Sequence, residues 1–166
     1  MGYPIFPLQS GFNKKDFSCG KDMLDNYIQK QASQDLKRRL SAVFAMVDDG
    51  RVIGYYTLSS TSISRDLVPE DVQKKMPPSY HDLPATLLGR LAVDQNYKGQ
   101  RLGEYLLMDA LKVALDVSEK HIGSIALIVD PLDEDAEAFY AKYDFIKLDS
   151  GKMFLPMQTI ASLFKS

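Results

Sequence analysis

The sequence has few of the residues that disulfides and metal sites require. Its 166 residues contain one cysteine, Cys19, so no disulfide can form within the chain, and two histidines, His81 and His121, which are far apart. Metal ligation therefore has no support, and Cys19 has no histidine partner for covalent catalysis. No apolar run approaches the roughly 18 residues that a membrane-spanning helix needs. We accordingly expect neither a metal nor a membrane partner.

An excess of charge of one sign is also absent. The 20 Lys and Arg against 22 Asp and Glu give a net charge of −2, and 45% of the residues are hydrophobic, which excludes a disordered or collagenous chain. No secretory leader is evident at the N-terminus, and with one cysteine this predicts a cytoplasmic protein. Because no repeat or linker interrupts the chain, we expect a single domain over residues 1–166.

The charges are unevenly distributed along the chain. Residues 14–39 carry seven basic and four acidic side chains, a local excess of +3. Five acids, by contrast, crowd into residues 130–137. The basic segment has two interpretations, a solvated helix face or a surface for a polyanion.

Apolar spacing predicts a mixed order of helices and strands. Helical spacing covers 21–40, which could form two consecutive helices, and 101–117. Two β-rich runs flank a four-residue connection that contains Gly50, which predicts a hairpin. A long irregular excursion is expected over 59–83. The expected strands are 42–47, 52–58, 86–93, 122–129, 145–148 and 153–155, with further helices near 69–75, 133–142 and 158–164. The order is that of a mixed α/β sheet rather than a doubly wound one.

The most informative segment is the polar loop between the strand ending at Val93 and the helix beginning at Arg101. The first N–H groups of a helix are unpaired and lie at the positive end of its dipole, so they favour anions. Gly99 and Gly103 leave room for phosphate oxygens. The loop matches neither the Gly-x-x-x-x-Gly-Lys-Ser/Thr nor the Gly-x-Gly-x-x-Gly pattern, which disfavours ATP and NAD.

Two motifs resemble the GNAT superfamily of N-acetyltransferases. The run Leu-Gly-Arg-Leu-Ala-Val-Asp at 88–94, followed by Tyr-Lys-Gly-Gln-Arg-Leu-Gly-Glu-Tyr-Leu-Leu at 97–107, resembles motif A of that family. The run Ala-Glu-Ala-Phe-Tyr-Ala-Lys-Tyr-Asp-Phe at 136–145 resembles its later helix and strand. The resemblance covers nearly the whole chain. It implies an α+β fold with a central mixed, mostly antiparallel sheet of about six to seven strands flanked by helices, and acetyl-CoA as co-substrate.

The resemblance also implies where acetyl-CoA would bind. The main chain of Leu91, Ala92 and Val93 would pair with the pantetheine arm, and the N–H of Val93 would polarise the thioester carbonyl. The pyrophosphate would lie on the next loop, which comprises Lys98, Gly99, Gln100, Arg101, Leu102, Gly103 and Glu104. Four positions depart from the family pattern. Lys98 opens the loop where Arg or Gln is usual. Arg101 and Asp144 stand where glycine is usual, and Asp133, which is included among the cofactor-binding residues, stands where Asn is frequent. Arg101 could pair with a phosphate or obstruct its approach.

Acetyl transfer requires a neutral amine and a proton for the departing thiolate. The resemblance implies that Tyr140 is the general acid, and the alternative is a core tyrosine whose hydroxyl is bonded to the main chain. No general base is evident. An α-amine, with a pKa near 8, is partly neutral at pH 7 without one, whereas lysine, with a pKa near 10.4, is not. This favours α-amines as acceptors.

A narrower resemblance begins near the N-terminus. The runs Phe-Ser-Cys-Gly-Lys-Asp-Met-Leu-Asp-Asn-Tyr-Ile at 17–28 and Gln-Ala-Ser-Gln-Asp at 31–35 resemble the acetyltransferase toxins of type II toxin-antitoxin systems. This resemblance implies acetylation of the α-amine of aminoacyl-tRNA, inhibition of translation and neutralisation by a ribbon-helix-helix antitoxin. The tRNA backbone would then contact Lys30, Lys37, Arg38, Arg39 and Arg90.

Two other functions stay open on the sequence alone. An acetyltransferase of a small-molecule or protein amine could use the acids of 130–137 to attract a cationic acceptor. A non-catalytic binding module could have kept the fold and lost cofactor affinity through Lys98 and Arg101. The sequence also leaves open whether the protein forms a homodimer.

Overall fold

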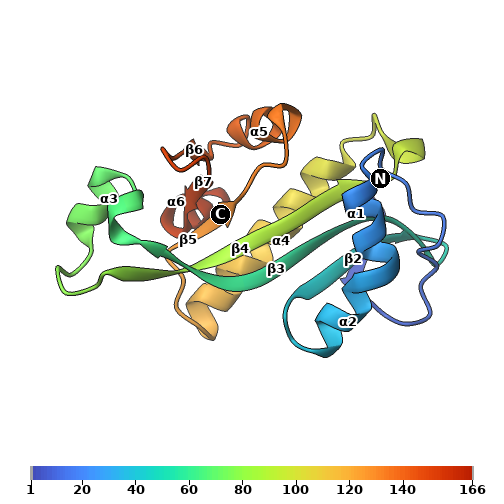
Figure 1. Ribbon diagram of the computed structural model, residues 1–166, viewed down its shortest axis with the longest axis horizontal. Helices are drawn as coiled ribbons and strands as arrows, with labels where there is room; N and C mark the ends of the chain where they lie inside the picture. The colour runs from blue at the N-terminus through green and yellow to red at the C-terminus, as the bar shows by residue number, and fades with distance from the viewer. Residues whose placement is uncertain (1, 166) are drawn as a thin grey trace. The chain divides into compact units, whose positions relative to one another are not determined.

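The protein is described by a computed structural model that covers residues 2–165 (Figure 1). The elements in chain order are β1 (Ile5–Pro7), α1 (Asp22–Asn26), the π-helical turn η1 (Tyr27–Gln31), α2 (Ala32–Lys37), β2 (Ala42–Asp48), β3 (Arg51–Ser64), the 3-10 turn η2 (Arg65–Leu67), α3 (Glu70–Lys75), β4 (Asp82–Val93), the 3-10 turn η3 (Gln95–Tyr97), α4 (Leu102–Lys120), β5 (Ala126–Val129), α5 (Glu134–Ala141), β6 (Ile146–Lys147), β7 (Met153–Pro156) and α6 (Met157–Leu163). This order confirms the expected succession of helices and strands.

Within residues 2–165 seven strands form one sheet, in the order β1-β2-β3-β4-β5-β7-β6. The β1–β2, β2–β3, β5–β7 and β6–β7 pairs are antiparallel, whereas β4 and β5 are parallel. The sheet is therefore mixed and mostly antiparallel, which confirms the α+β fold class that the resemblance implied.

The chain divides into two compact units. The first comprises Met1–Ser59 and Gly89–Ala110, and the second comprises Ser60–Leu88 and Leu111–Ser166. In the sequence, the first unit has 11 Lys and Arg against nine Asp and Glu, whereas the second has nine against 13. The first unit is thus net positive and the second net negative, a difference that matters for the partners each can attract.

In the first unit, α1, η1 and α2 form one nearly continuous helical segment that lies alongside β2 (Figure 1). The π-helical turn closes with the Ala32 N–H donating to the Tyr27 carbonyl, one residue further than an α-helical bond. This local widening lets both Tyr27 and Ile28 point into the core, where they pack with Phe17, Val43 and other apolar side chains. The predicted pair of consecutive helices is confirmed, with a π turn as the joint.

The hairpin is tighter and its second strand longer than predicted. Pairing of β2 with β3 continues to Asp48 and Arg51, so the connection has two residues rather than four. Asp49 and Gly50 form it at φ of 51° and 78°, the positive values that two-residue hairpin turns require. The prediction of an irregular excursion from residue 59 was also wrong, because β3 continues to Ser64, and Ile63 is buried between an exposed Ser62 and a partly exposed Ser64.

The second unit is built on the first part of β4, on β5 and on β7. β4 and β5 are in parallel register from Thr86↔Leu127 to Leu88↔Val129. β5 begins at Ala126 rather than at the predicted Ile122, which is exposed. Helix α6 packs against β5 and β7. The core of this unit contains Ile63, Val68, Leu83, Ala85, Ala126, Ile128, Leu148 and Phe154.

Gly54 marks a close approach of β3, β4 and α4 in the first unit. A Cβ there would lie 2.9 Å from Leu106 Cδ1 and 3.3 Å from the Ala92 carbonyl oxygen. We expect Gly54→Val to lower the free energy of unfolding by about 1–3 kcal/mol through overpacking. At Gly11 nothing lies within 4 Å of the equivalent atom, so Gly11→Val should change stability little. Urea denaturation compares the two variants, and equal stability would contradict the close packing.

Candidate functional site

The candidate pantetheine strand is the last part of β4. The pairing of β4 with β5 ends at Leu88, whereas β4 itself continues for five more residues, to Val93. On the other edge, the main chain continues to pair with β3 up to Asp94, whose N–H donates to the Ile53 carbonyl at 2.8 Å. A strand edge beyond the end of its register offers N–H and C=O groups to an extended ligand. Leu91, Ala92 and Val93, predicted from the sequence, lie on this stretch.

The loop after β4 has two residues with positive φ. Gly99 and Arg101 have φ of 87° and 59°, so Arg101 adopts the left-handed conformation at a position where the superfamily pattern has glycine. Asp144, the other residue that replaces a glycine, has φ of 71°. Both substitutions therefore keep the glycine-like backbone. The side chains of Arg101 and Gln100 are exposed.

Helix α4 begins directly after this turn. The N–H of Tyr105 donates to the Arg101 carbonyl at 3.2 Å and so makes the first bond of the helix. The N–H groups of Leu102, Gly103 and Glu104 precede it and have no carbonyl four residues earlier in the helix. They can therefore donate to a phosphate, which the helix dipole also favours. Lys98 Nζ donates to the Cys19 carbonyl at 3.2 Å.

The sequence analysis missed Asp94, which fixes this loop. The residue is 3% exposed. One carboxylate oxygen accepts from the Ser18 N–H at 3.1 Å, and the other accepts from the Asn96 N–H at 2.9 Å, capping η3. Gln95 N–H donates to the Ser18 carbonyl at 2.8 Å. The N-terminal motif and the loop, distant in sequence, are thus joined through main-chain groups. An acid placed directly between a strand and a turn was the available signal.

Cys19 is part of this junction and is not a nucleophile. Its N–H donates to Asp25 Oδ1 at 2.8 Å, and its side chain is buried. Burial raises the pKa of the thiol to about 11, with the hydrogen bond to Asp25 acting in the same direction. A thiol that stays protonated at neutral pH cannot attack a thioester efficiently.

Tyr140 lies on α5 in the second unit and is buried. Its ring packs against Phe139 and Phe145, each with a centroid distance of 5.2 Å. Its hydroxyl makes no hydrogen bond to any residue within the described range 2–165. Within this range no hydrogen bond joins it to the main chain, and the role of Tyr140 as general acid stays a prediction. Desolvation by burial raises the pKa of the phenol above its ordinary value of 10.

Asp133, also in the second unit, caps α5. Its Oδ1 accepts from the Ala136 N–H at 2.9 Å, as the sequence predicted for an N-cap aspartate. Its predicted contact with the cofactor stays a prediction. The predicted site residues thus belong to both units: the strand and loop to the first, and Asp133 and Tyr140 to the second.

The predicted polyanion-binding residues belong to the first unit. Lys30, Lys37, Arg38 and Arg39 are exposed on η1 and at the C-terminal end of α2. Arg90 differs from them, because its guanidinium carbon lies 3.6 Å above the centre of the Tyr27 ring. The Tyr27 hydroxyl in turn donates to Asp35 Oδ2 at 2.8 Å. Arg90 is thus held by stacking, whereas the other four extend into solvent.

Residues 2–165 contain no cluster of three or more His, Cys, Asp and Glu side chains that could hold a metal ion. The two histidines, His81 and His121, are exposed. None of the helices in this range has both the length and the apolar character needed to cross a bilayer.

Comparison with known proteins identifies relatives of the whole fold. The acetyltransferase (GNAT) family matches residues 12–145. The chain is 38% identical over 129 residues to a tRNA-acetylating toxin of Mycobacterium tuberculosis, covering 78% of this chain and 75% of the toxin. It is 35% identical over 158 residues to a Sinorhizobium fredii protein named "Probable toxin TacT", covering 89% of this chain and 86% of that protein.

Solved structures show the same similarity. A crystal structure of a tyrosine-to-phenylalanine mutant of KacT aligns with a TM-score of 0.92 at 30% identity, covering 99% of this chain and 100% of that one. AtaT complexed with acetyl-methionyl-tRNAfMet aligns with a TM-score of 0.89 at 28% identity, covering 98% of this chain and 99% of that one. AtaTR bound with acetyl-CoA aligns with a TM-score of 0.86 at 27% identity, covering 99% of each chain.

Alkylation with iodoacetamide tests the environment of Cys19. A pKa of about 11 instead of 9.0 means that the neutral thiol persists to higher pH, so at pH 8 the thiolate fraction is about a hundredfold lower than for an unperturbed thiol. We expect the native protein to be labelled at least about a hundredfold more slowly than the urea-unfolded chain, with a rate that still rises above pH 9. Mass spectrometry follows the single cysteine. Similar rates for the native and unfolded protein would contradict this assignment.

Proposed function

The chain belongs to the acetyltransferase (GNAT) family, and from this premise we propose that it transfers the acetyl group of acetyl-CoA to the α-amine of an aminoacyl-tRNA and so inhibits translation. The observation that carries the choice of acceptor is the 38% identity to a tRNA-acetylating toxin over 78% of this chain. The exposed basic side chains on the net positive first unit support it, because a polyanion needs several clustered cations.

Acetyl-CoA binds, in this proposal, along the end of β4 and the loop that follows. The main chain of Leu91, Ala92 and Val93 pairs with the pantetheine arm. The pyrophosphate oxygens accept hydrogen bonds from the main-chain N–H groups of residues 98–104. The support is the strand edge beyond Leu88, together with the glycine-like backbone of Gly99 and Arg101 before the first turn of α4. The exposed Arg101 guanidinium can then pair with a phosphate without closing the turn.

The acetyl transfer is direct. The neutral α-amine attacks the thioester carbonyl carbon, whose oxygen accepts a hydrogen bond from the Val93 N–H. The C–N bond forms as the C–S bond breaks, and the amine proton passes to solvent. Tyr140 gives its phenolic proton to the departing thiolate and regains one from solvent. Cys19 has no part in this sequence, since its thiol is buried and protonated.

The electrostatics of Tyr140 suit a proton donor. Desolvation raises the pKa of the phenol, so the protonated form dominates throughout the physiological pH range. An α-amine with a pKa near 8 is about one-tenth neutral at pH 7, which removes the need for a strong base. The acceptor amine, rather than the enzyme, should therefore set the rise of rate with pH.

The partners of this activity are a charged tRNA and an antitoxin. The exposed side chains of Lys30, Lys37, Arg38 and Arg39 contact the tRNA backbone, and Arg90, which is already stacked on Tyr27, adds a fixed cation. The likeness of residues 17–35 to toxin acetyltransferases supports a ribbon-helix-helix antitoxin, and translation as the target supports a cytoplasmic location.

Gly103→Glu tests the pyrophosphate loop. A carboxylate in the first turn of α4 would occupy the phosphate site and repel the ligand, so acetyl-CoA binding should be lost. Isothermal titration calorimetry measures the affinity. The control is Gly123→Glu, at an open surface position where nothing lies within 4 Å of an added Cβ. Unchanged affinity in the Gly103 variant would remove the loop assignment.

Tyr140→Phe tests the general acid. Because the hydroxyl makes no hydrogen bond within residues 2–165, its removal should leave the fold intact and lower kcat by about a hundredfold or more, the usual contribution of a general acid. Single-turnover acetylation of a charged tRNA mixture with radiolabelled acetyl-CoA measures the rate. The control is Tyr143→Phe, which removes a phenolic hydroxyl three residues later in the chain. Its acetylation rate should be close to that of the wild type. Full activity of Tyr140→Phe would exclude the role.

Reversal of Arg38 and Arg39 to Glu tests the tRNA surface. We expect the KM for charged tRNA to rise at least about tenfold and the dependence of log KM on log salt to weaken by about one unit per lost phosphate contact. Acetyl-CoA affinity should not change. Lys74→Glu with Lys75→Glu, an exposed basic pair on α3 in the second unit, is the charge-matched control. An equal effect of the two double variants would show that only net charge matters.

A further inference from the structure

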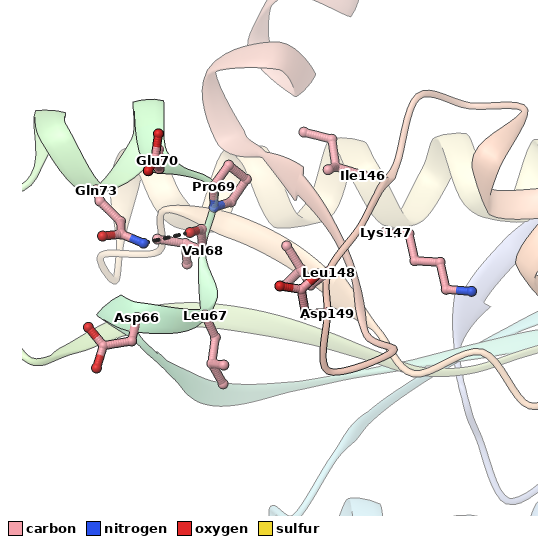
Figure 2. Close-up of a pocket in the computed structure, with 10 residues that line it drawn as sticks. All are labelled: Asp66, Leu67, Val68, Pro69, Glu70, Gln73, Ile146, Lys147, Leu148 and Asp149. Atoms are coloured by element: carbon pink, nitrogen blue, oxygen red, sulfur yellow. Dashed lines mark hydrogen bonds between the residues drawn. The ribbon is translucent and has the colours of Figure 1, made fainter.

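A groove in the second unit is lined by none of the residues used in the proposed reaction. Its volume is about 370 Å³. One wall is formed by residues 66–70 with Gln73, and the other by residues 146–149 (Figure 2). None of these residues was singled out by the sequence motifs, so the groove needs an explanation of its own.

The wall formed by residues 66–70 is held rigid by side-chain bonds to carbonyl groups. Gln73 Nε2 donates to the Val68 carbonyl at 2.9 Å, as Figure 2 shows. The Arg65 guanidinium donates to the carbonyls of Gln73 and Met76 at 2.7 and 2.9 Å, and so fixes the C-terminal end of α3. Val68 on this wall and Leu148 on the other are anchored in the core of the unit. A groove with fixed walls loses little entropy when a ligand enters.

The wall formed by residues 146–149 contains the edge strand of the sheet. The strand order ends at β6, whose one neighbour is β7. Leu148 N–H donates to the Lys152 carbonyl at 2.8 Å. Because main-chain groups alternate along an antiparallel pair, the N–H and C=O of Lys147 point to the outer edge, away from β7. An edge of this kind can accept a further extended chain.

The lining of the groove combines apolar surface with negative charge. Leu67 and Ile146 are 42% and 43% exposed, which is high for large apolar side chains. Asp66, Glu70 and Asp149 are exposed acids on the same walls. The lining base, Lys147, lies 2.8 Å from Glu137 Oε1, so its charge is already compensated. The second unit as a whole is net negative.

We propose that this groove binds an extended peptide segment of a partner protein, with alternating basic and apolar residues, which adds to the outer edge of β6. The basic side chains meet Asp66, Glu70 and Asp149, and the apolar ones cover Leu67 and Ile146. A nucleic acid is disfavoured by the acids. A second copy in a symmetric dimer would bring the same acids against each other, which is also unfavourable. The proposal goes beyond acetyl transfer and does not rest on it.

The probe is a fluorescein-labelled heptapeptide of alternating lysine and valine, titrated with the full-length protein and followed by fluorescence anisotropy. We expect saturable binding at low salt that weakens as salt is added. The same peptide with glutamate in place of lysine should not bind. A form methylated on every amide nitrogen should also fail, because it cannot pair with a strand edge. No binding of the lysine peptide, or equal binding of the methylated one, would overturn the proposal.

Charge-matched variants locate the site. Asp66→Asn, Glu70→Gln and Asp149→Asn together should weaken binding about tenfold, since three exposed charge contacts are lost. Glu119→Gln, Glu134→Gln and Asp135→Asn remove as many exposed acids from the same unit away from the groove, and should change the affinity less than twofold. Equal effects would show non-specific attraction and overturn the proposal. Circular dichroism checks that both variants fold.

The apolar contact and the rival occupant are tested with Leu67→Asn and Ile146→Asn, which remove apolar surface without adding charge. This double variant should lose peptide binding at any salt concentration. Its acetylation of charged tRNA should equal the wild type, so failure of this proposal is distinguishable from failure of the acetyltransferase assignment. If the wild type forms a concentration-dependent dimer that the double variant does not form, the occupant is a second copy and the peptide proposal is overturned.

Discussion

The buried carboxylate of Asp94 is the contact on which the geometry of the first unit depends. It accepts from the main-chain N–H groups of Ser18 and Asn96, and so joins the N-terminal motif to the loop between β4 and α4. A hydrogen bond to a charged acceptor contributes about 1.5–3 kcal/mol, so these two bonds couple the two segments. Lys98 and Gln95 add bonds to the same N-terminal stretch. The N-terminal motif, which resembles toxin acetyltransferases, and the motif at 88–107, which resembles motif A of the GNAT superfamily, are therefore joined: the first fixes the loop that the second provides.

The chemistry follows from a division of physical properties between the two units. The first unit is net positive, carries exposed bases at the end of α2, and presents unpaired amides at the start of α4, which suits it to phosphate groups of both substrates. The second unit is net negative and holds Tyr140 among Phe139 and Phe145, where desolvation keeps the phenol protonated. Its acidic side chains would repel a polyanion. In the groove beside β6 they would instead attract a basic peptide.

Much of the fold could be predicted from sequence because it depends on local patterns. Apolar spacing located α4 and the helical segment of residues 21–40, and the type of residue at Asp133 predicted the N-cap that the structure has. The end of β3 was missed because its residues are mostly small and polar, so their hydrophobicity does not alternate along the sequence. The burial of Ile63 in the structure shows that this stretch belongs to the strand. The roles of Asp94 and Arg90 could not be predicted, since each depends on a partner, Ser18 or Tyr27, that is brought near only by the tertiary fold. The positive φ of Arg101 and Asp144 could not be predicted either, because neither residue type by itself indicates that conformation.

Asp94, through its two main-chain bonds, holds the loop in the shape that we propose binds acetyl-CoA. The most direct measurement is the dissociation constant of acetyl-CoA for Asp94→Ala, obtained by calorimetry at a temperature where circular dichroism shows the variant folded. The account predicts affinity weakened at least about tenfold, because the loop would then have to be ordered by the ligand itself. An unchanged dissociation constant in the folded variant would contradict it.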